Sequence, residues 1–359
     1  MKRIRGLDGV RALSTLGIVA FHFYSHSHSA RKLFFAYANG TWGDTLVYVF
    51  LMLSGASLWC RNGGKRISVR QFYFKRWKSL MPPFYLVFAY TFFIRAIEAG
   101  RLFFLSPHVR PASLILSALG MDGYFYYRAP NYYYVGEWFL GAILFLYIAY
   151  PLVHRCFTRA KWPVYGALAL AFVAVPRLIR FQIPFSHNLI TCGFAFVTGM
   201  VLFDSVDRIR DVRVLMAAAL AALLLLVYPV PFARDILAFG MGVCVFIIAF
   251  HIGERARGRV YAAVRKVSEL SYPVYLIHHV LILKSLETLD SASTAASLQV
   301  LLVDCVLIFV FAKVLLIVMD SVYQSALFQR LEASFGRIEA ASDAIDWDDI
   351  AQTKGKFQK

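Results

Sequence analysis

The sequence predicts an all-α polytopic membrane protein with about ten transmembrane helices, and two observations lead to this fold class. Of the 359 residues, 59% are apolar and only 16% are charged, whereas a soluble domain carries roughly 25% charged residues. The apolar residues also occur in blocks of about 17 to 25, the length that crosses the roughly 30 Å hydrocarbon core of a bilayer. Together these observations exclude a soluble globular domain.

Ten apolar segments are the predicted spans, and each is expected to form one helix. They cover residues 7–24, 44–60, 80–97, 135–153, 163–179, 187–203, 214–230, 235–252, 267–287 and 296–318. The apolar stretch 112–121 is too short to span and is predicted to be an interfacial lid element. Because the loops are short, we expect one membrane domain over 1–324 and a cytoplasmic tail over 325–359 that begins with an interfacial helix.

The distribution of Lys and Arg predicts which way the chain faces. If the N-terminus is inside, 26 of the 38 basic residues lie in inner segments and 10 in outer ones. Cytoplasmic loops are enriched in Lys and Arg, so both termini are expected in the cytoplasm of a multi-pass protein of the cell membrane, inner or plasma. The same asymmetry explains the net charge of +17 without a nucleic-acid partner. Membrane lipids are the expected partners, and the oligomeric state stays open.

Two ionisable residues lie inside the first predicted span. Arg11 and His22 are eleven residues apart, so they share nearly the same helix face about 16 Å apart and are candidates to line one passage. An idle interfacial histidine is an equally open interpretation of His22. A metal cluster of His22, His26 and His28 is a third, but no nearby carboxylate or fourth ligand supports it, and no metal is predicted.

A basic segment over 61–78 follows the second span. Its density of cations is typical of topogenic charge that also attracts anionic lipid. The alternative is a mouth that binds the phosphates of a nucleotide donor, in which Arg70, Lys75, Arg76 and Lys78 are the candidate ligands. The interleaved aromatic residues suit an adenine ring as well as a headgroup boundary.

The predicted outer side carries an aromatic segment, YFYYRAPNYYY, over 124–134. Tyr at this depth is usually an interfacial belt. The alternative is a carbohydrate platform, because aromatic faces pack on sugars while phenol groups bind hydroxyls. The candidate residues for contact with the acceptor are Tyr132, Tyr133, Tyr134, Glu137, Trp138, Arg177 and Arg180.

Five motifs in order resemble the integral-membrane acyltransferase 3 family. They are LDGVRALSTLGIVAFH at 7–22, VFLMLSG at 49–55, FYFKRWKSLMPPFY at 72–85, GEWFLGAILFLYIAYP at 136–151 and ELSYPVYLIHH at 269–279. The family's basic motif usually has two arginines three apart before the proline. Here they fall on Arg76 and Ser79, so the contacts with the donor differ at Ser79.

The resemblance implies transfer of an acyl group, such as acetyl, from cytoplasmic acyl-CoA to an extracytoplasmic carbohydrate, which is free or lipid-linked. It implies that His22 acts as general base, or as a covalent acyl carrier, at the end of a donor passage that runs past Arg11. Tyr275 and His278 are expected at the substrate, and the candidates for stabilising the oxyanion are Tyr272, Tyr275, His278 and Ser54. The main rival is a transporter or flippase for a lipid-linked sugar, since it would need the same cations, aromatics and intramembrane histidine.

Overall fold

The protein is almost entirely helical in the computed structural model, which describes residues 3–29, 32–100, 109–179, 182–289 and 293–343. The long helices are α1 (Arg5–His26), α2 (Trp42–Asn62), α3 (Val69–Ala99), α6 (Glu137–Arg159), α7 (Lys161–Leu178), α8 (Leu189–Asp204), α10 (Val212–Val227), α11 (Arg234–Arg255), α12 (Gly258–Thr288), α13 (Thr294–Gln324) and α14 (Ala326–Asp343). The short elements are β1 (Ala36–Tyr37), β2 (Gly40–Thr41), η1 (Pro111–Ser113), α4 (Leu114–Ala118), α5 (Asp122–Phe125), η2 (Phe185–His187) and α9 (Val206–Ile209). The two strands pair antiparallel, with Ala36 opposite Thr41.

Each of the ten predicted spans coincides with a long helix, from α1 to α13. Among the described residues, five helices are long and apolar enough to cross a membrane, namely α2, α3, α6, α11 and α13. Helices α7, α8 and α10 are apolar but shorter than these five. The all-α fold class is therefore confirmed, while the count of ten spans and the orientation remain predictions.

Glycine contacts allow the central helices to approach closely. Helix α1 packs against α2, α11 and α12, and α2 packs along α8. A Cβ atom at Gly55 of α2 would overlap the carbonyl oxygen of Phe196 in α8, and one at Gly199 of α8 would overlap that of Met52. A Cβ at Gly9 of α1 would meet the Cα of Gly253 in α11 at 2.6 Å. Small residues at helix interfaces in membranes serve this purpose.

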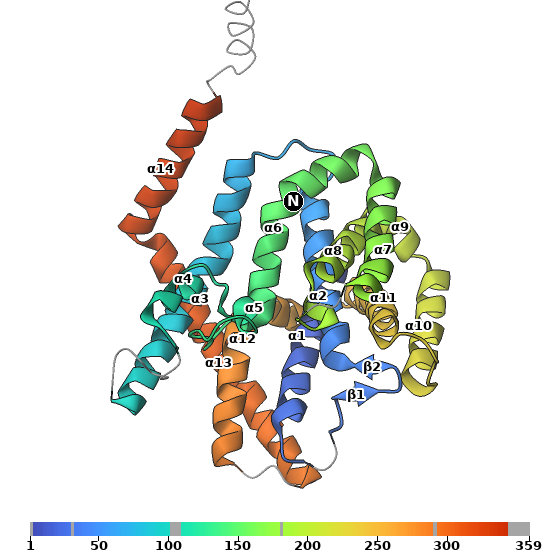
Figure 1. Ribbon diagram of the computed structural model, residues 1–359, viewed down its shortest axis with the longest axis horizontal. Coiled ribbons are helices and arrows are strands. Elements are labelled where there is room, and N and C mark those ends of the chain that lie inside the picture. Colours follow the sequence, from blue (N-terminus) through green and yellow to red (C-terminus); the bar gives the residue numbers. More distant parts are fainter. Residues whose placement is uncertain (1–2, 30–31, 101–108, 180–181, 290–292, 344–359) are drawn as a thin grey trace, which may run out of the picture.

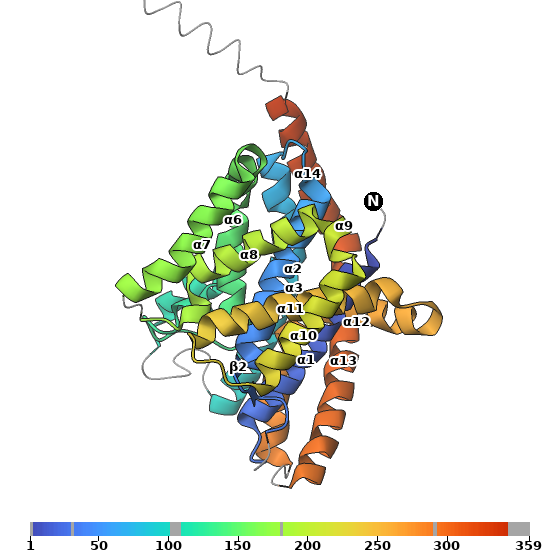
Figure 2. The same cartoon turned by 90° about the vertical axis from the view of Figure 1, so that its right-hand side faces the viewer.

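The helices form a bundle with α1 and α2 near its middle (Figure 1). In this view α7, α9 and α10 lie on one side of the centre, and α3 and α14 lie on the other. In Figure 1 and in the perpendicular view of Figure 2, the first described residues and α14 lie toward the same end of the molecule. This arrangement is compatible with the expectation that both termini face the same side.

The predicted lid and tail each contain a helical element. The stretch 112–121 folds as most of η1 followed by α4 and a turn. The tail starts with the predicted helix, α14, which packs on α3 through Phe335 and Phe74 with 4.3 Å between ring centroids. The final residues of the tail, 344–359, lie outside the described residues.

Candidate active site

A cavity of about 700 Å³ lies among α1, α2, α3, α6 and α12. Its basic end lies near the start of α1 and is lined by Arg3, Arg11, Arg61 and Arg76, together with Asp8 and Glu269, which pair with Arg3. Its histidine end lies toward the end of α1, where His22, Trp138, Tyr275 and His278 line it. One continuous space therefore joins residues that the sequence places in five different segments.

Helix geometry explains why Arg11 and His22 lie on the same cavity. Their spacing of three turns predicts one helix face, and the structure confirms this because both side chains line the cavity. The Nη2 atom of Arg11 lies 3.5 Å from the hydroxyl oxygen of Ser57 on α2. The guanidinium is thus held between two helices, partway along the route to His22.

Asp8 fixes the start of α1 against α12. Its buried carboxylate accepts hydrogen bonds from Arg3 Nε at 2.6 Å, from the Tyr261 hydroxyl at 3.0 Å and from the Ser268 hydroxyl at 2.8 Å. A buried carboxylate is tolerated when it is paired with a cation and its other lone pairs are satisfied. This network sets the position of α1, and hence of His22, relative to the histidines of α12.

His278 on α12 lies beside His22, with 5.0 Å between the ring centroids. The Nδ1 atom of His278 lies 3.1 Å from the carbonyl oxygen of Val274 and 2.9 Å from that of Tyr275. A carbonyl only accepts hydrogen bonds, so Nδ1 carries the proton in the neutral ring. The Nε2 atom of this tautomer is then an acceptor.

Arg76 is the member of the predicted donor set that reaches the cavity. Its Nε atom is buried and has no hydrogen-bond partner among the described residues. The guanidinium lies over the rings of Phe72 and Tyr147, at 5.8 and 5.6 Å from their centroids. Ser79 also lines the cavity, and its hydroxyl donates to the carbonyl of Lys75. The second arginine of the family's motif would therefore lie at this cavity as well.

The other three predicted donor residues lie outside the cavity that the described residues form. Arg70 is exposed, and the exposed Lys75 donates to Gln71 Oε1 at 2.7 Å. Lys78 pairs with Glu332 of α14 at 2.8 Å. The periodicity of α3 explains this split, since only one face of a helix can point into the cavity.

The predicted acceptor residues divide between the cavity and its surroundings. Trp138 and Tyr275 line it, and the Trp138 ring stacks on His187 with 3.7 Å between centroids. Tyr132 is fully buried, and its ring packs on Phe92. Tyr133, Tyr134 and Arg177 lie outside the lining, and Arg177 donates to the carbonyl of Val173 in its own helix. The side chains of Glu137 and Arg180 are outside the described residues.

The hydroxyls of the candidate oxyanion residues have different surroundings. Tyr272 donates to the carbonyl of Leu80 and Tyr275 donates to that of Gly136, both at 2.7 Å. These bonds tie α12 to α3 and to the start of α6. Ser54 lines the cavity just before Gly55, the close contact between α2 and α8.

Sequence reasoning missed several polar residues of the cavity, among them Ser57, Arg61 and Tyr147. Arg61 is the first cation of the basic segment and so carried a signal. Ser57 lies three residues after Ser54, which places it on the same face of α2. Tyr147 belongs to a quoted motif, but nothing in its spacing distinguishes a cavity tyrosine from an interfacial one.

Comparison with known proteins decides the family. An acyltransferase domain, that of the acyltransferase 3 family, matches residues 4–319. The chain belongs to the acyltransferase 3 family. The match spans every predicted membrane segment, so the domain is a multi-pass membrane acyltransferase. No curated protein and no solved structure matched the chain.

Proposed function

We propose that this acyltransferase 3 protein is an O-acyltransferase of the cell membrane. It transfers an acyl group, acetyl in the simplest case, from cytoplasmic acyl-CoA to a hydroxyl of an extracytoplasmic or lipid-linked glycan. The observation that carries the proposal is the single cavity with Arg76 and Arg11 near one end and His22 at the other. Such a cavity suits a donor with a polyanionic head and a reactive thioester at the tip of a long arm.

The arginines of the basic end favour binding of the donor's phosphates. Arg61 and Arg76 would hold the nucleotide phosphates, and the planar guanidinium suits bidentate contact with phosphate oxygens. The arm would then pass Arg11 and reach His22, which lies about 16 Å further along α1 by helix rise. An extended pantetheine arm can cover this distance.

His22 is the proposed general base. It takes the proton from the acceptor hydroxyl while the oxygen attacks the thioester carbonyl, the new C–O bond forms and the C–S bond breaks. The coenzyme A thiolate leaves and receives the proton from His22. General base catalysis contributes roughly 10²- to 10⁴-fold to rate. His278, whose ring centroid lies 5.0 Å from that of His22, is the residue that would orient the His22 ring for this step.

Release of coenzyme A by the purified protein tests the proposal. Wild-type protein in proteoliposomes, supplied with acetyl-CoA and a glycan acceptor, should release free thiol and acylate the glycan. His22→Ala should insert and fold but lose at least about 99% of the transfer, because the general base is removed. Glycan movement across the bilayer without thiol release would instead favour the flippase, and an acylated His22 peptide would favour the covalent mechanism.

A further inference from the structure

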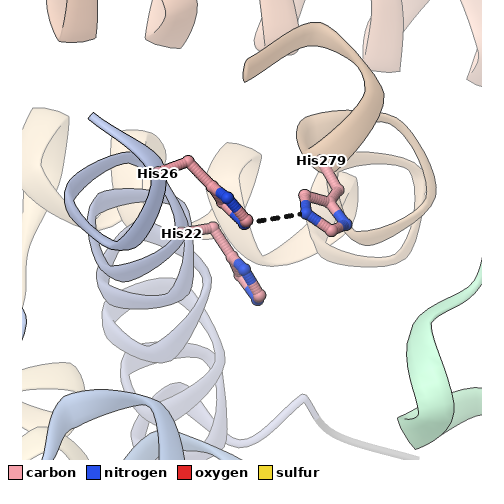
Figure 3. A group of neighbouring side chains, drawn as sticks. All are labelled: His22, His26 and His279. Carbon is pink, nitrogen blue, oxygen red and sulfur yellow. Dashed lines mark hydrogen bonds between the residues drawn. The ribbon is translucent and has the colours of Figure 1, made fainter. Parts of the chain in front are cut away.

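The structure brings a third histidine to the pair on α1. His279 of α12 lies beside His22 and His26, and the three side chains converge from two helices (Figure 3). The ring centroid of His279 is 5.1 Å from that of His22 and 5.1 Å from that of His26. His28, the third member of the group considered from the sequence, is not part of this cluster.

The distances within this histidine cluster suit a shared metal ion. One ring nitrogen from each residue lies within 4.8 Å of the others, and His26 Nε2 is 3.1 Å from His279 Nε2. Two nitrogens bound tetrahedrally to zinc at 2.0 to 2.1 Å lie about 3.4 Å apart. The closest pair, which is hydrogen-bonded in this structure, already has nearly this spacing, and one nitrogen of His22 lies within 4.8 Å of both.

The surroundings also fit a metal site with an open position. His22 and His26 are four residues apart on α1, which is the spacing of paired histidine ligands on one helix. His26 is exposed, while His22 and His279 are partly buried, so an ion can reach the cluster from outside the bundle. Three imidazoles leave a fourth position for water, and imidazole suits zinc, copper and nickel.

We infer that His22, His26 and His279 bind a divalent transition-metal ion of the zinc class, and that this ion inhibits acyl transfer. A metal ion occupies the nitrogen lone pair that His22 needs as a base. The inhibition rests on the proposed function, whereas the binding does not. His26 and His279 lie outside the cavity lining, so their role here is to hold the ion rather than to contact donor or acceptor.

Binding is tested directly with Co²⁺ as a spectroscopic probe. Chelator-treated wild-type protein in detergent should bind one Co²⁺ per chain with a visible absorption band, and Zn²⁺ should displace it. His26→Gln and His279→Gln should each weaken binding at least about tenfold, since even outer-shell changes weaken metal affinity 10- to 100-fold. His28→Gln is the matched control and should bind as the wild type does. Absence of binding, or equal binding by all variants, would overturn the site.

Inhibition is tested separately on the same preparations. Zn²⁺ should lower coenzyme A release by the wild type, and a chelator should restore it. His26→Gln and His279→Gln should raise the half-inhibiting Zn²⁺ concentration about as much as they weaken Co²⁺ binding. Stoichiometric binding with unchanged turnover would overturn inhibition alone. If no transfer is seen with or without Zn²⁺, the proposed function and with it the inhibition fail, while the Co²⁺ titration still decides the site.

Discussion

The imidazole rings of His22 and His278 lie 5.0 Å apart, edge to face, on two helices that are far apart in the sequence. The Asp8 network joins the same two helices near the other end of the cavity. The backbone carbonyls before His278 fix its tautomer. The Asp8 network and these carbonyls therefore hold His22 and His278 in place relative to each other. A catalytic base and the residue that positions it are expected to be supported in this way.

His278 is expected to act as a positioning residue. Replacement by Ala should lower kcat at least about tenfold, because a misdirected base loses part of its catalytic contribution, while the KM for the acyl-CoA donor stays nearly unchanged. His278→Gln keeps an acceptor near the Nε2 position and should recover part of the rate. An unchanged kcat for the Ala variant would remove His278 from the mechanism, as would a parallel rise in donor KM without loss of kcat.

Arg76 is expected to bind the donor. Arg76→Gln should raise the KM for acyl-CoA and leave kcat and the acceptor KM nearly unchanged, because a phosphate contact is made equally in the ground and transition states. Lys75→Gln is the comparison on the same helix, since its exposed ammonium faces away from the cavity. Its effect on the donor KM should be several-fold smaller. Equal effects of the two variants would indicate that general basic charge on α3, not the cavity, attracts the donor.

The sequence was sufficient for features that depend on one segment at a time. In the described part of the chain, hydropathy located the ten long helices from α1 to α13, because span length and apolar composition are local properties. The helical repeat was enough to place Arg11 and His22 on one face, which the shared cavity confirms. The tail was likewise predicted to begin with a helix, which is found as α14.

Features that depend on two segments could not be predicted in the same way. Residue spacing predicts which helix face a residue occupies but not what packs against that face. The sequence therefore gave no indication that His279 lies against the histidines of α1. For the same reason Lys78 looked equivalent to Arg76, although Glu332 of α14 pairs with it. Tyr132 looked like an interfacial residue, but α3 covers it through Phe92.

Asp122 predicts a pH dependence of stability. This buried side chain lies in α5, outside the predicted spans, and burial raises its pKa to about 7 from an ordinary 3.8. Between pH 4 and 7 the folded protein keeps a proton that the unfolded chain has lost, so the free energy of unfolding falls as pH rises through this range. The slope contributed by this group is at most about 1.4 kcal/mol per pH unit. It vanishes above pH 7.

The midpoint of thermal unfolding in detergent, measured between pH 5 and 8, tests the contribution of Asp122 to the pH dependence of stability. Asp122→Asn should show a flatter profile than the wild type and should gain most at the alkaline end. Asp207→Asn in α9, where the carboxylate is exposed, is a control for carboxylate removal elsewhere, and it should leave the contribution of Asp122 in place. Parallel wild-type and Asp122→Asn profiles would contradict the assignment.

Trp138 is the aromatic residue expected to contact the glycan acceptor, because its ring lines the histidine end of the cavity while Tyr133 lies outside the lining. Aromatic faces pack on the apolar faces of sugars, and we take the value for a pair of aromatic rings, about 0.5 to 1.5 kcal/mol, for this contact. Trp138→Leu retains apolar burial but loses the flat face, so the acceptor KM should rise about two- to twelvefold. The donor KM should change less.

Tyr133→Leu separates this contact from the alternative that the 124–134 segment itself is the sugar platform. If the acceptor lies against Trp138, the Tyr133 variant should keep its acceptor KM within about twofold, since a rim contact contributes little. Steady-state kinetics with a defined glycan acceptor distinguish the two. The opposite result is a raised acceptor KM for Tyr133→Leu and an unaltered acceptor KM for Trp138→Leu. It would place the acceptor on the tyrosine segment and not in the cavity, because only residues that touch the sugar change its binding when apolar volume is retained.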